Sequence, residues 1–501
     1  MKRTLLTLIV ILLTLGTVWS RPAKTEFSDR YYLTFDATET DRIRVKALLY
    51  LEDSILYMSP YGPMPGRWPE YIVNLTVQTE VGEELPVRKT QEGTWIVPQR
   101  ATGGQVALFY EMVLEHEEIA WPGGIDGVAY SRDWGVMASG RSLFVMNGKT
   151  KKDIQVHVEA PENWNISASW LSADAAGTTY RVGNLRTLQE SFLVAGTHRE
   201  TEIVRDGFAL KFVLGGGNVE EQASRYVQVA TSVMEYYIDL MGGIPKPAPG
   251  MELNQSLVII SQSEDIDGEV IGNHISMFMN PEGGPMDQMM GWFMFAHEFF
   301  HLWNGKTLRF TDTSTDWFKE GISNYYTIKA LVQTGFITED ISFAILDNLF
   351  YQRYIQDPGY GSLSPSRAAS GFDKDNHWGL VYGGGLFAGI AIDMEIRQHT
   401  GNSSSLDDLM RSFYRQYGGT EKLIGQGDIL KAANQLGSTD FKGLMKTHIQ
   451  GPEPISLAPY LKFAGISVDT AEGQLHLTHN PEKTALQTAI WEGFLGKDQG
   501  H

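Results

Sequence analysis

Two hydrophobic patterns divide the chain, and the change from one to the other falls near residue 205. From about residue 28 onward, apolar and polar positions alternate with a period of two or form short β-branched and aromatic runs between Gly, Pro and Asn. This pattern is typical of strands. We identify eight of them: YYLTFDA, IRVKALLYLE, YIVNLTVQTE, TWIVPQ, QVALFYEMVLE, SLFVMN, IQVHVEAP and FLVAGTH. The pattern predicts an antiparallel β domain over 21–205.

After residue 206 the apolar positions follow a helical period. The segment VEEQASRYVQVATSVMEYYIDLMG is predicted to be an amphipathic helix that ends at Gly242, while SLVIIS and VIGNHISMFM are predicted to be strands. Further helices are predicted near 287–304, 316–336, 340–355, 380–400, 404–417 and 439–449. The fold class is therefore multi-domain α+β, with a mostly helical domain over 206–455. The remaining segment, 456–501, has room for a hairpin and a helix but not for another full domain.

The first residues have the organisation of a secretory signal peptide. Two basic residues precede an apolar run from Leu5 to Val18, and small residues then lead to a cleavage site expected near Ser20, with Ala23 as the second choice. We assign 1–20 to the signal peptide and expect a secreted or periplasmic protein without stable membrane association after cleavage. The alternative is an uncleaved anchor, although the run is shorter than the roughly 20 residues that a membrane span needs.

Composition narrows the classes of function. The 501 residues carry a formal net charge of −19, which argues against nucleic acid as a partner because phosphates would be repelled. The chain contains no cysteine, so it has no disulfide, no thiol nucleophile and no Cys-ligated metal. Nothing in the composition indicates an oligomeric state.

Ionisable residues interrupt the most hydrophobic helical stretch, FMFAHEFFHLWNGK. His297 and His301 are four residues apart and therefore share one helix face, with Glu298 beside them. A buried polar group without a partner costs about 1–3 kcal/mol, so something must compensate for this burial. A divalent metal held by both imidazoles would do so. The alternatives are that the histidines are core residues with satisfied hydrogen bonds, or that the HExxH motif occurs here by chance.

A third ligand is expected on the next predicted helix, within the segment DWFKEG. Glu320 follows His301 after eighteen intervening residues, an interval that suits a turn and a second helix packed beside the first. A catalytic zinc site usually has three protein ligands and one open position. We therefore predict one Zn²⁺ per chain, held by His297, His301 and Glu320. Taken alone, Glu320 would be an ordinary surface carboxylate.

The strings HEFFHLWN and WFKEGISNYY resemble the motifs of gluzincin metallopeptidases, and within them those of the glycyl aminopeptidase family. The segment LVYGGGLFAGIAIDMEIRQHTGNSSSLDDLM and the β-rich stretch ELPVRKTQEGTW are also similar to that family, so that the resemblance covers most of 30–470. It implies a thermolysin-like catalytic domain after the β-rich domain, bound zinc, and peptides as substrates. The runs GGG at 215–217 and 383–385 lack the Lys-Ser/Thr of a phosphate loop and indicate turns or close packing.

The resemblance also implies roles for individual residues. Glu298 would be the general base that takes a proton from zinc-bound water and passes it to the leaving amine. Tyr382 matches the family's catalytic tyrosine, whose hydroxyl would stabilise the oxyanion; the alternative for Tyr382 is a core aromatic. Asn324, one turn after Glu320, could orient a ligand or be a surface residue.

One motif departs from the family. Its strand G-G-L-E-H, which anchors the substrate amine through the Glu, matches VIGNHISMF here, with Asn273 at the Glu position and His274 in register with the His. Asn carries no charge to pair with an ammonium. Glu269, in the acidic loop 264–269, is the candidate replacement, and solvated loop charges are the alternative.

These observations favour an aminopeptidase that prefers small N-terminal residues such as Gly or Ala. The first alternative, favoured by Asn273, is a zinc endopeptidase or oligopeptidase without a requirement for an amine. The second is a catalytically weak peptide-binding protein. Family members commonly end in a PDZ domain, and PISLAPYLKFAGISV resembles the linker into it, but only about thirty residues follow Val468. A vestigial or absent PDZ domain is therefore expected.

Overall fold

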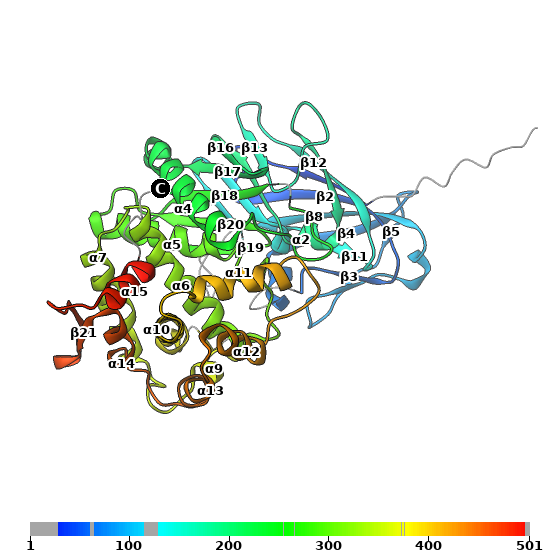
Figure 1. Ribbon diagram of the computed structural model, residues 1–501. Helices are drawn as coiled ribbons and strands as arrows, with labels where there is room; N and C mark the ends of the chain where they lie inside the picture. The colour runs from blue at the N-terminus through cyan, green and yellow to red at the C-terminus, as the bar shows by residue number, and fades with distance from the viewer. Residues whose placement is uncertain are drawn as a thin grey trace, which may run out of the picture.

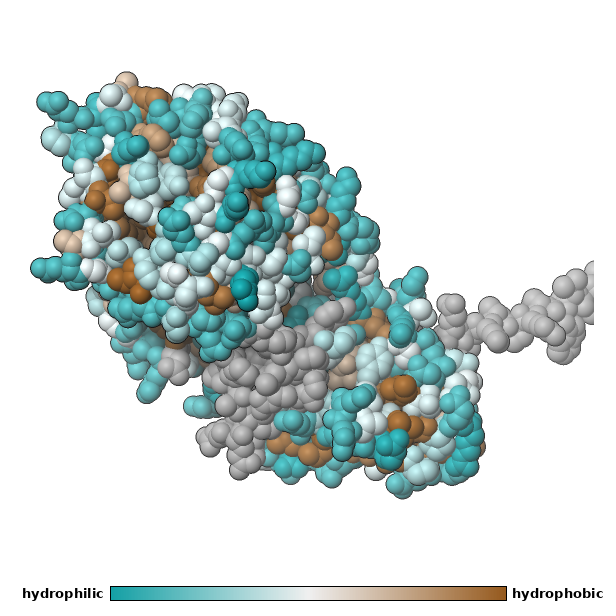
Figure 2. Space-filling model, turned by 90° about the horizontal axis from the view of Figure 1, so that it is seen from below, coloured by the Kyte–Doolittle hydropathy of each residue, from teal (hydrophilic) through white to brown (hydrophobic). Residues whose placement is uncertain are grey.

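A β-rich part and a mostly helical part lie side by side in the computed structural model (Figure 1). The structure describes residues 29–60, 65–114, 129–253, 255–264, 266–371, 373–374 and 376–495. The expected signal peptide lies outside these residues and stays a prediction. On the face shown in Figure 2, hydrophobic residues lie in small groups among hydrophilic ones.

The largest sheet of the first part has seven strands in the order β14-β12-β1-β2-β8-β4-β5. Buried and exposed positions alternate along β2, as the period-two pattern predicts. All neighbours are antiparallel except β1 and β12, which run parallel. The strands are β1 (Arg30–Thr34), β2 (Arg42–Tyr50), β4 (Ile72–Thr79), β5 (Glu84–Leu85), β8 (Gln105–Val113), β12 (Lys152–Glu159) and β14 (Thr179–Asn184).

Two four-stranded sheets complete this part, in the orders β13-β15-β10-β9 and β11-β3-β7-β6. The predicted strand SLFVMN is not one strand: its first two residues end the helical turn α1, and only its last two residues form β11. The remaining elements are β3 (Ile55–Tyr57), η1 (Pro65–Tyr71), β6 (Arg88–Lys89), β7 (Trp95–Ile96), η2 (Gln99–Ala101), β9 (Ala129–Arg132), β10 (Gly135–Ser139), α1 (Gly140–Leu143), β11 (Met146–Asn147), β13 (Asn165–Ala168), α2 (Leu185–Gln189) and β15 (Phe192–Gly196).

A fifth sheet, in the order β16-β17-β18-β20-β19, begins the second part. Its strands are β16 (Arg199–Arg205), β17 (Phe208–Gly215), β18 (Ser256–Gln262), β19 (Asp267–Ile271) and β20 (His274–Met279). The predicted boundary at residue 205 is therefore wrong, because it divides the β16–β17 hairpin. Asp206 and Gly207 both have positive φ, as a tight hairpin turn requires.

The predicted strand VIGNHISMFM is in fact two antiparallel strands. Ile271 pairs with His274, and the chain reverses between them through Gly272, whose φ is +58°. A Cβ at Gly272 would lie 2.4 Å from the carbonyl oxygen of Glu190, so glycine is required on steric grounds too. The consequence is that β19, not β20, is the edge strand of the sheet.

Both faces of the fifth sheet are covered. One face packs against α4 (Ala223–Met241) and α5 (Pro285–Phe300), where α4 ends at Gly242 in the left-handed conformation as predicted. The other face packs against the β13-β15-β10-β9 sheet of the first part through a small apolar cluster: Tyr130, Trp134, Met137, Phe192, Val194, Val213, Leu257, Ile259, Ile271 and Phe278. Gly215 permits this contact, because its missing Cβ would lie 2.1 Å from the Trp134 ring.

Helices build the rest of the second part, near the predicted positions except for α9 and α12, which the sequence pattern did not indicate. They are α3 (Gly217–Glu221), η3 (Thr313–Thr315), α6 (Asp316–Gln333), α7 (Glu339–Ala344), η4 (Ile345–Tyr351), α8 (Gln352–Gln356), α9 (Pro365–Ala368), η5 (Gly379–Gly383), α10 (Gly384–His399), α11 (Leu406–Tyr417), α12 (Gln426–Gly437), α13 (Lys442–Leu444) and η6 (Met445–Ile449). The longer η segments, η4, η5 and η6, are π-helical.

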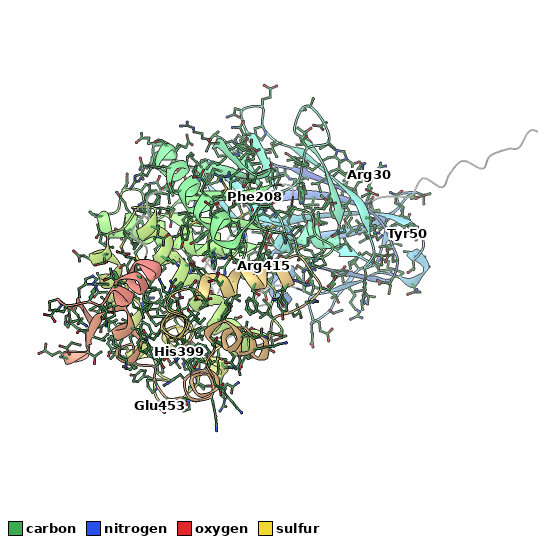
Figure 3. All side chains as sticks on the ribbon, in the orientation of Figure 1. Arg30, Tyr50, Phe208, His399, Arg415 and Glu453 are labelled. Carbon is green, nitrogen blue, oxygen red and sulfur yellow. The ribbon has the colours of Figure 1, made fainter. Side chains whose placement is uncertain are left out.

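The segment Gly379–His399 is, within the described residues, the one helix long and apolar enough to cross a membrane, but 89% of its apolar window is buried in the protein. It is the central helix of the second part, and His399 marks its end in Figure 3. We therefore interpret its hydrophobicity as that of a core helix.

The predicted hairpin and helix after residue 456 are present. They comprise α14 (Ala458–Leu461), η7 (Lys462–Ala464), β21 (Ile466–Asp469), η8 (Ala471–Gly473), β22 (His476–His479) and α15 (Ala485–Leu495). The helix α15 joins the helical core, because Phe494 packs on Tyr325 with ring centroids 5.5 Å apart and Arg397 donates to the Gly493 carbonyl at 2.8 Å.

Candidate metal and active site

Helix α5 and the residue that caps it bring three candidate side chains to one place. The N-terminus of α5 is fixed by Asp287, which accepts a hydrogen bond from the Gly284 N–H at 3.0 Å. The Nε2 atoms of His297 and His301 face each other at a distance of 3.1 Å. The two residues are 5% and 9% exposed. The low exposure of both histidines shows that this polar face of α5 is shielded from bulk solvent.

Glu320 on α6 meets the two histidines. Its Oε2 lies 3.1 Å from Nε2 of His301 and 3.5 Å from Nε2 of His297. The three ligand atoms lie within 4.8 Å of one another, and no second cluster of this kind occurs among the described residues. The tertiary structure therefore brings together the three residues that the sequence predicted as metal ligands.

The hydrogen bonds around His301 prepare it as a ligand. Its Nδ1 lies 2.9 Å from the carbonyl oxygen of Asn304. A carbonyl only accepts, so Nδ1 carries the proton and the lone pair of Nε2 faces the cluster. Burial lowers the pKa of His301, although Glu320 acts in the opposite direction, which favours the neutral imidazole that a metal needs.

Two lysines hold the other oxygen of Glu320. Its Oε1 lies 3.2 Å from Nζ of Lys374 and 3.3 Å from Nζ of Lys319. Burial alone would raise the pKa of this carboxyl, but Lys374 and Lys319 hold it well below its ordinary value. Two neutral imidazoles and one ionised carboxylate are a donor set that fits a divalent zinc ion.

A cavity of about 880 Å³ opens over these ligands. Its volume lies in the range of binding sites for small molecules and peptides. Its walls come from β19, α5, α6, η4, α8 and η5, and from the segments between them. The described residues of its wall include Gly268, Glu269, Glu298, Arg353, Trp378 and Tyr382.

Glu298 and the edge strand lie next to each other in this cavity. Oε1 of Glu298 is 4.0 Å from Nε2 of His297, so the carboxylate borders the point at which the ligands converge. Gly268 of β19 leaves room for it, since a Cβ there would lie 3.0 Å from Cγ of Glu298. A peptide that extended the sheet at β19 would thus pass directly beside Glu298, the candidate general base.

Tyr382 also lines this cavity and lies in the π-helical turn η5. Its ring centroid is 6.3 Å from that of His297, and the ring stacks on Trp378 at 5.0 Å with an interplanar angle of 5°. Tyr382 therefore lies beside the candidate metal ligands. Asn324 is buried, and its Nδ2 lies 3.5 Å from the carbonyl oxygen of Tyr382, so that it connects α6 to η5.

Glu269 occupies one end of the cavity. Nη1 of Arg141 lies 3.8 Å from its Oε1, and burial raises the pKa of this carboxyl in spite of that cation. Nearby, Lys306 donates from Nζ to the carbonyl oxygen of Val270 at 3.0 Å, and burial lowers its pKa to about 8. A carboxylate, a lysine and strand backbone therefore share this end of the cavity.

The predictions for Asn273 and His274 as substrate-binding residues are wrong, because both lie at the hairpin turn and do not line the cavity. Asn273 is 2% exposed, and its backbone carbonyl accepts from Ser256. His274 Nδ1 accepts from the Leu257 N–H at 3.1 Å, and burial lowers its pKa to about 3. Both residues stabilise the sheet.

Several residues of the site were not predicted. Ser323, with Oγ 3.4 Å from Nδ1 of His301, and Lys319 are neighbours of Glu320 within the same motif, so a helical projection could have suggested them. Lys374 is 54 residues from Glu320, in a segment without regular structure. No local signal connects the two, and only the fold does.

Family models match two parts of this chain. The model of the Peptidase M61 N-terminal domain matches residues 64–197, and the model of M61 glycyl aminopeptidase matches residues 292–382, which includes all three candidate ligands, Glu298 and Tyr382. No curated protein matches the chain.

Solved structures share the fold. An aminopeptidase N family protein from Idiomarina loihiensis superposes with a TM-score of 0.77 at 18% identity, over 88% of this chain and 79% of that one. A mutant of the M1 zinc metallopeptidase from Deinococcus radiodurans, bound to a Tyr-Ser-Ala substrate, gives a TM-score of 0.53 at 12% identity, over 86% of this chain and 94% of that one.

Proposed function

We propose that this chain, which carries the N-terminal and peptidase domains of the M61 glycyl aminopeptidase family, is a zinc-dependent aminopeptidase that acts on short peptides. The observation that carries the proposal is the convergence of His297, His301 and Glu320 beside Glu298 and under an edge strand. Zinc is supported by the donor set and by a fold shared with a zinc metallopeptidase. One ion per chain would bind there.

The chain's own residues supply the remaining chemistry. A bound zinc ion would act as a Lewis acid toward water and the peptide carbonyl. Glu298 accepts the proton of the attacking water at its carboxylate and donates it to the nitrogen of the leaving amine. The Tyr382 hydroxyl, whose ring lies 6.3 Å from that of His297, donates a hydrogen bond to the oxygen on which negative charge develops. The edge strand β19 aligns the extended substrate.

Glu269 is the proposed anchor for the substrate's amino group. It follows Gly268 on strand β19 and lines the same cavity as Glu298. A carboxylate in a largely buried position binds an ammonium strongly. This assignment replaces Asn273, and it restores the acidic group that the sequence comparison found missing.

A preference for Gly or Ala at the substrate's N-terminus stays part of the proposal. It is supported by the description of the matching family as glycyl aminopeptidases. We also propose that the enzyme acts outside the cytoplasm, as the organisation of residues 1–20 suggests.

An endopeptidase or oligopeptidase is the second candidate. It is favoured by Arg141, which lies 3.8 Å from Glu269 and offsets part of its charge, so that the amine would be bound less tightly. A peptide-binding protein with little activity is the third, and it predicts affinity without turnover.

Matched peptides test the proposal. Gly-Ala-Phe with a free or an acetylated N-terminus is incubated with zinc-loaded protein, and the products are identified by mass spectrometry. An aminopeptidase cleaves the first bond of the free peptide only. Cleavage of the acetylated peptide would support the endopeptidase instead.

The variant Glu298→Gln tests the base. The amide cannot accept the proton, so hydrolysis is lost while zinc content, measured by elemental analysis, stays at the level of the unchanged protein. Turnover close to that of the unchanged protein would refute the role of Glu298. Glu395→Gln, on α10 and outside the cavity wall, is the matched control.

A further inference from the structure

The cationic side chains of the cavity wall are not alike. Four of its described residues are Lys or Arg, namely Lys306, Lys319, Lys374 and Arg353. Lys306 donates to the Val270 carbonyl, and Lys319 and Lys374 pair with Asp316 and Glu320 at 2.9 and 3.2 Å. The side chain of Arg353 makes no hydrogen bond or ion pair with any described residue, and Arg353 is exposed.

Aromatic rings hold Arg353 in place. Its Cζ lies 4.8 Å from the centroid of Trp378, a distance typical of a cation–π contact. Trp378 is itself fixed, since it stacks on Tyr382 at 5.0 Å and on Phe350 at 5.5 Å. The guanidinium is thus positioned before any ligand binds, while its N–H donors remain available, and this lowers the entropic cost of binding an anion.

The same rings limit the distance between Arg353 and the candidate metal ligands. The centroid of Trp378 is 5.0 Å from that of Tyr382, which is 6.3 Å from that of His297. With the 4.8 Å step to Arg353, the guanidinium lies at most about 16 Å from the His297 ring. An extended peptide spans about 3.3 Å per residue, so at most about four residues fit between the cut bond and Arg353.

Arg353 and Glu269 belong to opposite ends of the cavity. Glu269 lies near Lys306, after the C-terminal end of α5. Phe350, which stacks on Trp378, also contacts Phe293, one turn before His297, at 5.8 Å. Arg353 therefore lies toward the N-terminal half of α5. Glu264, Asp267 and Asp287 also line the cavity, and being acidic they cannot bind an anion directly.

We propose that Arg353 binds the C-terminal carboxylate of the substrate and thereby selects short peptides with an uncapped C-terminus. A peptide whose ammonium lies at Glu269 extends past the metal ligands toward Arg353, where a carboxylate matches the planar, bidentate guanidinium. This inference rests on the proposed peptidase function, because it assigns the other end of the same substrate.

The test compares Gly-Ala-Phe as the acid and as the C-terminal amide. Zinc-loaded protein is expected to cleave the acid with a kcat/KM about tenfold higher than the amide, mainly through a lower KM. Arg353→Gln should reduce the rate on the acid to that on the amide. Arg415→Gln, an exposed position on α11 labelled in Figure 3, is the matched control and should keep the tenfold preference.

Equal rates on acid and amide with the unchanged protein, or a preference that survives in Arg353→Gln, would overturn the proposal. Measurements of peptide binding test the role of Arg353 even if the protein does not hydrolyse the peptides. The affinity of zinc-loaded Glu298→Gln for both peptides is measured by calorimetry, with and without Arg353→Gln. Absence of hydrolysis in every assay would refute the proposed function, while loss of an acid-specific affinity in the double variant would still support the role of Arg353.

Peptide length provides a second measurement. Acids and amides are extended at the C-terminus from three to eight residues. The preference for the acid should disappear once more than about four residues follow the cut bond, since the carboxylate then passes beyond the guanidinium. A preference independent of length would contradict the proposed contact.

Discussion

Gly321 on α6 and Gly385 on α10 are in backbone contact: a Cβ on Gly321 would lie 2.1 Å from the carbonyl carbon of Gly385, and one on Gly385 would lie 2.1 Å from the carbonyl oxygen of Trp317. The two helices can approach this closely only without side chains at the crossing. Glu320 precedes Gly321, and Tyr382 lies three residues before Gly385. The glycine contact therefore brings a candidate ligand and the candidate oxyanion donor to one cavity.

Gly385→Ala should destabilise the protein. The added methyl group overlaps backbone that cannot move without separating α6 from α10, and overpacking of this kind costs about 1–3 kcal/mol. Denaturant unfolding of the metal-free protein measures the change. Gly427→Ala is the control, because nothing lies within 4 Å of a Cβ at this exposed position in α12. There the alanine should be neutral or stabilising by up to about 1 kcal/mol. Equal effects at both positions would contradict the interpretation.

Glu320→Ala should lower zinc content. Without its carboxylate, only His297 and His301 remain as ligands, and two protein ligands hold zinc poorly. Zinc per chain after dialysis, and the shift of the melting temperature on adding zinc, should both fall. Glu421→Ala, at a side chain 84% exposed, should leave both unchanged. Unaltered zinc in Glu320→Ala would mean that the third ligand lies elsewhere.

Tyr382→Phe should reduce kcat by about 10²–10³ with little change in KM. Phenylalanine preserves the stack on Trp378, so the fold and zinc content should not change, and only the hydroxyl is removed. Steady-state kinetics on Gly-Ala-Phe provide the measurement, with the exposed Tyr360→Phe as control. A fall in kcat below threefold would remove Tyr382 from the chemistry.

His274 should make stability depend on pH. Burial lowers its pKa to about 3, whereas an unfolded histidine titrates near 6.5, so between these values the unfolded chain binds the extra proton. Its contribution to stability is thus complete above about pH 6.5 and declines by about 1.4 kcal/mol for each pH unit below it. His274→Asn keeps an acceptor for the Leu257 N–H without a titrating ring, so stability should depend less steeply on pH between 5 and 7.

Denaturant unfolding at pH 7, 6 and 5 tests this dependence. The control His476→Asn, on the exposed hairpin strand β22, should keep the slope of the unchanged protein. An equal slope in His274→Asn would show that other groups cause the acid sensitivity.

The helices and the candidate metal ligands on them were predictable because both depend on the sequence over a short range. His297 and His301 share a face through the helical period alone, and the aromatic residues around them indicated burial before any tertiary contact was known. Glu320 and Tyr382 followed from motifs that resemble a family. The close packing expected for GGG at 383–385 is confirmed by the Gly385 contact.

The edge strand was not predictable from hydrophobicity. The segment from Val270 to Met279 reads as one apolar run because both of its strands are buried, and the run does not record that the chain reverses at Gly272. One consequence was the wrong assignment of Asn273 and His274 to the substrate. The boundary at residue 205 failed for a related reason, since β16 has the same period as the strands before it.

The sequence by itself determined the β-rich and helical parts, the candidate ligands on α5 and α6, and the candidate general base, because each depends on spacing within one or two elements. Only the tertiary structure decided which residues share the cavity with them. Lys374 contacts Glu320, Glu269 rather than Asn273 lines the cavity, and Arg353 lies against Trp378. These contacts join segments of irregular structure or separate elements, whose relative position is set by core packing rather than by any local pattern.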